Sequence, residues 1–227
     1  MSITSGKVRR ALAAFAALAV TAFVPLKAEA VPVGFWSIDG GAYSSLSFGG
    51  PQTLGGIFGI TFANVSSNSP GSPLFAKLLQ TEFDVTNLTG VAHTLSVIVG
   101  DTGYTSPVAP PDVQVFTSAG GSITFPTGPV TAIAKAWLNP GNTVTSTPSG
   151  TLVANIGPFS LPVGGTASTT LSATGSAYAL IQQFDITAAG YSNYTSSMNT
   201  SVFVPEPGAL LLMGAGLLGL GLLRRRK

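Results

Sequence analysis

The stretch Tyr178-Ala-Leu-Ile-Gln-Gln-Phe-Asp-Ile-Thr187 decides the fold class of this protein. Its even-numbered positions are mostly apolar and hold Tyr178, Leu180, Gln182, Phe184 and Ile186. Its odd-numbered positions hold Ala179, Ile181, Gln183 and Asp185. Because successive side chains of a strand point to opposite faces, this period of two predicts a half-buried β-strand.

Short apolar or alternating runs of the same kind recur through residues 31–203. The expected strands are Val33–Asp39, Tyr43–Phe48, Ile57–Val65, Leu78–Thr86, Thr94–Val99, Val113–Thr117, Ser122–Phe125, Val130–Leu138, Thr151–Ile156, Thr169–Ala173, Tyr178–Thr187 and Ser201–Val204. Turn-forming clusters such as Asn68-Ser-Pro-Gly71 and Asn139-Pro-Gly-Asn142 separate them. Strands at this spacing, without internal repeats, predict an all-β body made of a single, jelly-roll-like β-sandwich over residues 31–203.

The composition argues against most classes of enzyme. Only 8% of the 227 residues are charged, far below the roughly 25% of ordinary soluble domains. The chain has no Cys and one His, which excludes disulfide scaffolds, thiolate metal sites, cysteine nucleophiles and multi-histidine zinc centres. We therefore expect no metal and no cofactor.

The charges are segregated along the chain. Between Val31 and Val204 two lysines and six acids leave a net charge of −4, so a basic surface for nucleic acid is not expected. The exposed faces of the body must then be supplied by Ser, Thr, Asn, Gln and Gly. Such an uncharged surface suits contact with neutral polymers such as polysaccharide, although low charge is equally a habit of secreted proteins.

The first thirty residues have the three parts of a secretory signal peptide. Basic residues precede the apolar run 11–24, and Pro25 ends that run. Ala28 and Ala30 place small residues before a cut by signal peptidase at Val31. The fourteen apolar residues are shorter than the ~20 of a stable membrane span, so cleavage is expected and the mature protein is exported.

The chain ends in an apolar segment followed by bases. Residues 208–223 carry no charge and would form a helix of about 24 Å, which predicts a short transmembrane helix. The positive-inside rule keeps the basic end in the cytoplasm and the body outside. The residues that set this topology are Arg224, Arg225, Arg226 and Lys227.

Pro205, Glu206 and Pro207 stand directly before the apolar segment. Two prolines around a glutamate favour an extended, stiff segment that continues neither a helix nor a sheet. With the apolar helix and the basic terminus, residues 204–227 resemble the PEP-CTERM sorting domain of exported bacterial proteins. The resemblance implies recognition of Pro205, Glu206 and Pro207 by an exosortase, a membrane-anchored precursor held transiently in the inner membrane, and a final place at the cell surface or in the biofilm matrix among exopolysaccharide.

Catalytic and metal-ligating groups in the body are sparse. A Ser-His-Asp arrangement would have to use His93, the one histidine, and Asp84, Asp101 or Asp112 could be its partner only by accident of folding. No G-x-S-x-G elbow is present, and a histidine at a strand edge is the simpler interpretation. Glu82 and Asp84 lie two residues apart on one face of an expected strand, which is more typical of a solvated face than of a glycosidase pair. The remaining candidates, each offering calcium one carboxylate, are Asp39-Gly40-Gly41 and Asp101-Thr102-Gly103.

Three functions therefore remain. We expect a non-catalytic structural or adhesive surface protein first, a secreted carbohydrate-binding module second and a secreted hydrolase last. The module would stack sugars on Trp36, Tyr43, Tyr104, Trp137, Tyr191 and Tyr194, of which the two tryptophans lie in apolar runs and are expected in the core. N-glycan acceptor patterns, expected by chance in so polar a chain, occur at Asn64, Asn87, Asn193 and Asn199.

Overall fold

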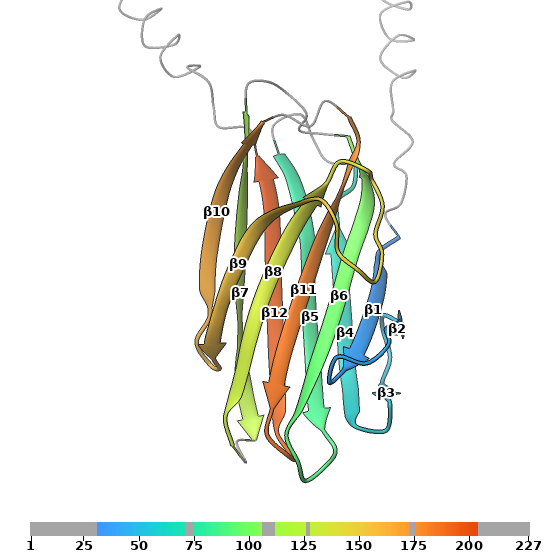
Figure 1. Ribbon diagram of the computed structural model, residues 1–227, viewed down its shortest axis with the longest axis vertical. Coiled ribbons are helices and arrows are strands. Elements are labelled where there is room, and N and C mark those ends of the chain that lie inside the picture. Colours follow the sequence, from blue (N-terminus) through green and yellow to red (C-terminus); the bar gives the residue numbers. More distant parts are fainter. Residues whose placement is uncertain (1–30, 71–74, 106–111, 126–127, 173–175, 204–227) are drawn as a thin grey trace, which may run out of the picture.

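The computed structural model describes residues 31–70, 75–105, 112–125, 128–172 and 176–203 (Figure 1). The expected signal helix in residues 1–30 and the expected membrane helix in residues 204–227 lie outside this described part. Within the described ranges, no helix is long and apolar enough to cross a membrane.

The described chain forms two antiparallel sheets of six strands each. The strands are β1 Val33–Ile38, β2 Ser44–Leu46, β3 Gln52–Leu54, β4 Phe58–Ser67, β5 Phe75–Asn87, β6 His93–Tyr104, β7 Asp112–Phe125, β8 Val130–Asn139, β9 Thr151–Ser160, β10 Gly165–Ser172, β11 Tyr178–Ala188 and β12 Asn193–Phe203. Sheet A has the order β2-β1-β6-β11-β8-β9, and sheet B has the order β10-β7-β12-β5-β4-β3 (Figure 1). The prediction of an all-β body with two layers is confirmed.

The last eight strands have a jelly-roll order, in which the chain crosses between the two sheets at each step except from β8 to β9, which form a hairpin in sheet A. Strands β5, β12, β7 and β10 are neighbours in sheet B, and β6, β11, β8 and β9 are neighbours in sheet A. Strands β1 to β4 extend both sheets on one side. This order places β11 between β6 and β8 in the middle of sheet A. One face of such a strand packs on the core, which requires the alternation of apolar and polar residues seen in residues 178–187.

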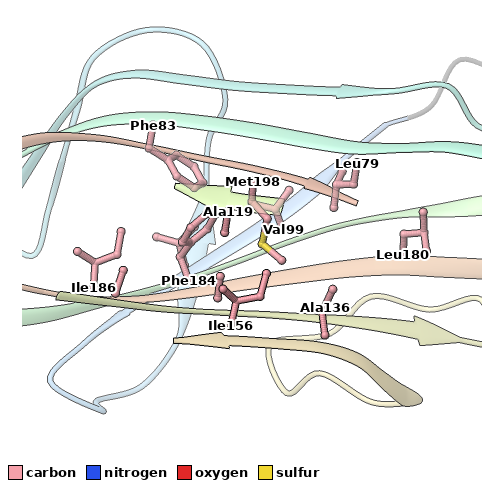
Figure 2. Close-up of a cluster of buried hydrophobic side chains, with 14 of the residues drawn as sticks. Leu79, Phe83, Val99, Ala119, Ala136, Ile156, Leu180, Phe184, Ile186 and Met198 are labelled. Carbon is pink, nitrogen blue, oxygen red and sulfur yellow. The ribbon is translucent and has the colours of Figure 1, made fainter. Parts of the chain in front are cut away.

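The core lies between the sheets and follows the period of two. Leu180, Phe184 and Ile186 point inward from β11 and meet residues of sheet B such as Phe83 (Figure 2). The rings of Phe83 and Phe184 pack edge to face with centroids 6.2 Å apart. Full burial of each such side chain contributes about 1.5–3 kcal/mol to folding, so this layer accounts for much of the stability.

One inward position of β11 is polar. Gln182 is 1% exposed, and its amide nitrogen donates to Leu79 O at 2.6 Å and to Thr200 Oγ1 at 2.9 Å. Its amide oxygen accepts from Thr81 Oγ1 at 2.6 Å. Since buried amides need all their partners, Gln182 links sheet A to β5 and β12 of sheet B at one defined register.

The short strand β3 was not predicted, and two of the strand predictions need correction. The expected strands Val113–Thr117 and Ser122–Phe125 form one strand, β7, which runs through Gly120 and Gly121. A Cβ at Gly121 would collide with the carbonyl oxygen of Thr195 on β12, so glycine here permits close pairing instead of a turn. The last strand begins at Asn193 rather than at Ser201, because Tyr194 and Met198 supply buried positions in a stretch that is otherwise polar.

Candidate functional site

The outward face of sheet B carries many small polar side chains. Register places small hydroxyl and amide side chains side by side on four neighbouring strands of this face. Its members are Thr166, Ser168 and Thr170 on β10, Gln114, Ser118 and Ser122 on β7, Thr195, Ser197, Asn199 and Ser201 on β12, and Thr86 on β5. The same face also carries the charged residues Glu82, Asp84 and Asp112 and the exposed ring of Phe116. Most of its other described positions present neutral donors and acceptors.

A shallow pocket of about 330 Å³ interrupts this face. Ser118, Ser197 and Asn199 contribute its polar lining, and Gly120 leaves its floor open. A Cβ added at Gly120 would meet only Gly164 Cα, at 3.6 Å, so the pocket exists because position 120 lacks a side chain. The arrangement suits a small neutral group rich in hydroxyls.

Glu82 and Asp84 lie on this same outward face, both half-buried, as their spacing predicts. Glu82 stands opposite Ser197 on β12 and Asn64 on β4, and Asp84 stands opposite Thr195. Both carboxylates therefore come from one strand, whereas a glycosidase normally draws its pair from separate elements.

The outward face of sheet A is organised differently. Asp185 accepts from Ser96 Oγ at 2.6 Å and from Gln183 Nε2 at 2.7 Å, and it forms an ion pair with Lys135 at 3.4 Å. Tyr43 extends the network through a 3.0 Å hydrogen bond between its hydroxyl and Ser96 Oγ. The sequence did not predict this network of five polar side chains, because its members lie far apart in the chain. Tyr43 and Asp185, for example, are 142 positions apart.

Part of sheet A is covered by the loop 140–150. The side chain of Asn142 accepts from Gly103 N at 2.7 Å, and Val144 packs where Gly100 leaves room, since a Cβ there would lie 2.7 Å from its methyl carbons. Figure 1 shows this loop between β8 and β9 passing across sheet A. The polar network on sheet A therefore borders a surface that this loop covers.

The six aromatic candidates do not assemble on one surface. Tyr104 and Tyr194 are fully buried, and Tyr104 stacks on Tyr178 with centroids 5.6 Å apart. Trp36 packs against the core, as expected, and donates its indole N–H to Ser45 O at 3.1 Å.

The prediction of a core position for Trp137 is wrong. On β8 the small residues Ala132, Ala134 and Ala136 face the core, which leaves Trp137 half-buried on the outward face with Lys135. Of the six candidates, the exposed side chains are Tyr43 at 37% and Tyr191 at 63%, which lie on different segments. Phe116, which was not a candidate, is 38% exposed on the outward face of sheet B, opposite Ser168.

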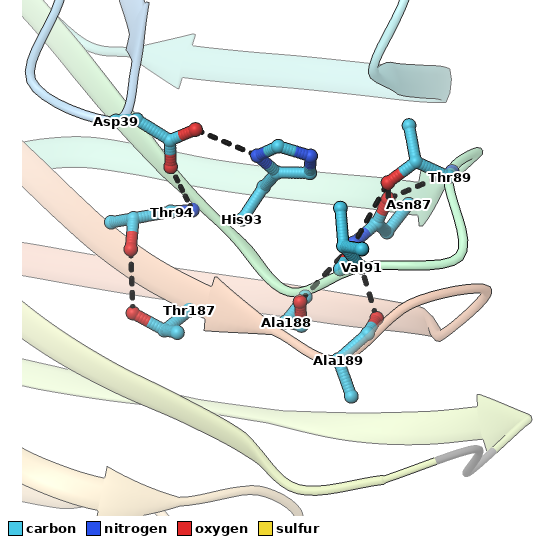
Figure 3. Close-up of polar contacts among 9 residues, drawn as sticks. All are labelled: Asp39, Asn87, Thr89, Val91, His93, Thr94, Thr187, Ala188 and Ala189. Carbon is cyan, nitrogen blue, oxygen red and sulfur yellow. Dashed lines mark hydrogen bonds and ion pairs between the residues drawn. The ribbon is translucent and has the colours of Figure 1, made fainter.

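His93 is the first residue of β6, in line with the strand-edge interpretation, and its partner is Asp39 (Figure 3). Its Nδ1 lies 2.6 Å from Asp39 Oδ2, and Thr94 N donates to Asp39 Oδ1 at 2.8 Å. Asp84, Asp101 and Asp112, which could have paired with His93 only by accident of folding, are therefore not its partner. The backbone N–H of Thr94, and then His93, lower the pKa of Asp39. Asp39 sits in a turn at φ +51°, so the pair ties the β1–β2 turn to β6.

Asp101 is buried, and this burial raises its pKa. Its Oδ1 accepts from Thr102 N at 2.8 Å. Among the described residues, no three His, Asp or Glu side chains gather at one point, so neither Asp39 nor Asp101 belongs to a carboxylate cluster.

The four N-glycan acceptor patterns lie at unequal depths. Asn87 is fully buried and donates to the carbonyl oxygens of Val91, Ala188 and Ala189 between 2.8 and 3.2 Å, which holds two loops together (Figure 3). Asn64 is exposed, and Asn193 and Asn199 are half-buried. Asn87 therefore serves the fold.

Comparison with known families gives a match at the end of the sequence. The family model described as the PEP-CTERM protein-sorting motif matches residues 203–227. The chain carries a PEP-CTERM sorting motif. The resemblance seen in Pro205, Glu206, Pro207 and the segments after them is thereby confirmed, and the motif marks an exported precursor that an exosortase processes. The motif residues themselves, the basic residues 224–227 and the Ala28–Ala30 pair lie outside the described residues.

Other comparisons add little. Curated protein sequences offer no match to this chain. A solved structure with some likeness is the enzymatically active domain of tailspike protein 4 of bacteriophage CBA120, with 12% identity and a TM-score of 0.28. The likeness covers 70% of this chain and 18% of that chain. A likeness this weak indicates neither the fold nor the activity of this protein.

The PEP-CTERM motif follows the folded body without a spacer. Its first residue, Phe203, is also the last residue of β12 and stands opposite Phe75 on β5 and Gln114 on β7. The motif therefore continues from a central strand of sheet B.

Proposed function

We propose that this protein is an exported, exosortase-sorted component of the cell surface or biofilm matrix, with a non-catalytic structural or adhesive body. The observation that carries the proposal is the PEP-CTERM motif at residues 203–227. In this proposal, signal peptidase removes residues 1–30, residues 208–223 hold the precursor in the inner membrane, and the exosortase recognises Pro205, Glu206 and Pro207.

The outward face of sheet B supports the adhesive role of the body. A neutral polysaccharide offers hydroxyl groups at regular intervals, and each protein hydrogen bond to one contributes only about 0.5–1.5 kcal/mol net. Binding must then come from many weak contacts over a wide face. Rows of serine, threonine and asparagine on β10, β7 and β12 meet that requirement without electrostatic attraction.

A secreted carbohydrate-binding module is the second candidate. It is favoured by the outward face of sheet A, where Trp137 lies two residues from Lys135 and beside the Asp185 network. One aromatic ring with fixed polar groups next to it is a common way to hold a sugar. The hydrolase ranks last, because the one histidine holds a turn through Asp39.

Sorting is tested with Glu206→Ala in a host that has an exosortase. Export and membrane insertion should persist, because they depend on residues outside position 206. Processing should stop, so that full-length precursor accumulates in the membrane fraction. Glu82→Ala, which removes a glutamate from the body, is the matched control and should mature like the parent. Normal maturation of Glu206→Ala would overturn the sorting proposal.

The two binding faces are separated by two substitutions. Gly120→Val adds a branched side chain at the pocket on sheet B, where the nearest atom to its Cβ would be Gly164 Cα at 3.6 Å, and Trp137→Ala removes the ring on sheet A. Retention of the protein on the host's exopolysaccharide should fall with Gly120→Val and remain with Ser122→Val, which lies on the same strand outside the pocket lining. A loss confined to Trp137→Ala would favour the carbohydrate-binding module instead.

A further inference from the structure

The two sheets have four edge strands, and three of them are protected. Strands β2 and β3 have three residues each, too few to pair with another chain. Strand β9 contains Pro158, and its pairing with β8 shifts register twice. Short length, proline and bulges are the devices by which natural sheets avoid pairing at their edges.

Strand β4 extends beyond β3, but that part is also secured. A register shift between Ile60 and Phe62 bends it. At its far end Ser67 Oγ bonds the hydroxyl of Tyr104 at 2.5 Å, and beyond the strand Ser69 Oγ donates to Thr102 O at 2.8 Å. Both contacts tie this end to β6 in the other sheet, which leaves no straight edge for an incoming strand.

Strand β10 has none of these protections. Its eight residues, Gly-Thr-Ala-Ser-Thr-Thr-Leu-Ser, contain no charge and no proline. All eight pair with β7 in a regular register, and none of the eight is buried. In Figure 1, β10 stands at the outer margin of the sandwich, with β7 as its hydrogen-bonded neighbour on one side. Its other side carries a row of backbone donors and acceptors.

We propose that the free edge of β10 pairs antiparallel with β10 of a second copy of this chain, joining two B sheets into one sheet of twelve strands. A second copy offers an edge of equal length, equally without charge, so no like charges meet in the pair. Antiparallel pairing of identical strands follows a two-fold axis perpendicular to the sheet, the commonest symmetry of oligomers.

The side chains of β10 restrict the register of this pair. Thr166, Ser168 and Thr170 point outward, while Ala167 and Leu171 pack against the core. A continuous sheet must keep outward rows on the same face, because a slip of one residue would exchange the faces. With a two-fold axis and nearly full overlap of the two strands, the residue on the axis is either Ser168 or Thr169. That residue then lies opposite the same residue of the second copy. The joined sheet also doubles the hydroxyl-rich face, although the pairing does not depend on what that face binds.

The absence of Cys makes the pairing directly testable. Ser168→Cys and Thr169→Cys are each introduced alone into the full chain, which is purified in detergent and mildly oxidised. Directly opposite residues have Cβ atoms about 4.5–5.5 Å apart, near the reach of a disulfide. We expect one of the two variants to cross-link into dimers in high yield, at least fivefold above Ser122→Cys, an exposed control on β7. Equal yields from all three variants, or no dimer from either β10 variant, would overturn the proposal.

A second measurement does not depend on cysteine chemistry. The double substitution Ser168→Lys and Thr170→Lys places like charges along the paired edge. Light scattering should show the parent at twice the mass of one chain and this variant at the mass of one chain, with an unchanged β-type circular dichroism spectrum. Ser122→Lys should remain dimeric. A parent that is monomeric, or a double variant that stays dimeric through its tail or another face, would contradict pairing at β10.

Discussion

Gln182→Met tests whether the buried amide holds the two sheets together. Methionine has a similar length, so the substitution removes three hydrogen bonds without opening a large cavity. A buried hydrogen bond contributes about 1 kcal/mol net, which predicts a loss of about 3 kcal/mol in the free energy of unfolding. For a domain of this size 1 kcal/mol corresponds to about 2–4 °C, so the Tm should fall by about 6–12 °C.

The cost of Gln182→Met should depend on its partners. Thr81 and Thr200 are fully buried, and the substitution leaves the Thr81 hydroxyl without its acceptor. Adding Thr81→Val removes this stranded hydroxyl, so the double variant should lose about 1 kcal/mol less than the sum of the two single losses. Urea unfolding of residues 31–203 measures all three variants. Additivity within about 0.5 kcal/mol, or a single loss below about 1 kcal/mol, would refute a coupled network.

Three further predictions concern the turn, the front end and the body as a whole. The folded pKa of Asp39 lies below its unfolded value, so its stabilisation is present above about pH 4 and is lost as pH falls through the folded pKa. Since Asp39 is 51% exposed, the stability difference between the parent and Asp39→Asn should be below about 1 kcal/mol at pH 7 and smaller still near pH 3, as measured by urea unfolding. The intact mass of the exported protein should place Val31, a 75% exposed residue of the described chain, at the amino terminus; a mass that retains residues 11–24 would contradict cleavage. Residues 31–203 expressed alone should give a β-type spectrum that EDTA leaves unchanged, and a loss of fold with EDTA would point to an ion site.

The fold was accessible from the sequence where apolar and polar residues alternate clearly. The stretch around Phe184 predicts β11, with Leu180 and Ile186 on the core side, and the structure confirms it. The same rule overlooked the start of β12, because serine, threonine and asparagine occupy most of its positions and hide the buried Tyr194 and Met198. Tertiary pairing on both sides outweighs this low apolar content.

Trp137 shows how the inward and outward faces of a strand can be assigned the wrong way round. Residues 132–138 are Ala-Ile-Ala-Lys-Ala-Trp-Leu, so both alternate rows contain apolar residues. The row that holds Trp137 also holds Lys135, and a lysine is rarely placed in a core. That charge was the available signal for the outward position. The contact between Asp39 and His93 had no comparable signal, because 54 residues separate its partners and only the fold brings them together.

The junction between β12 and the PEP-CTERM motif restricts how the precursor can be processed. Phe203 is paired on both sides, and Pro205 offers no N–H to extend the sheet, so the strand ends next to the motif. Four residues separate Phe203 from Gly208, and the five Cα–Cα steps between these two residues span at most about 18 Å when extended. If residues 208–223 insert as proposed, the end of sheet B lies within that distance of the membrane segment. The exosortase must then act on a motif that lies between the folded body and the membrane segment. The sequence of the motif fits this need, because two prolines around Glu206 disfavour both helix and sheet.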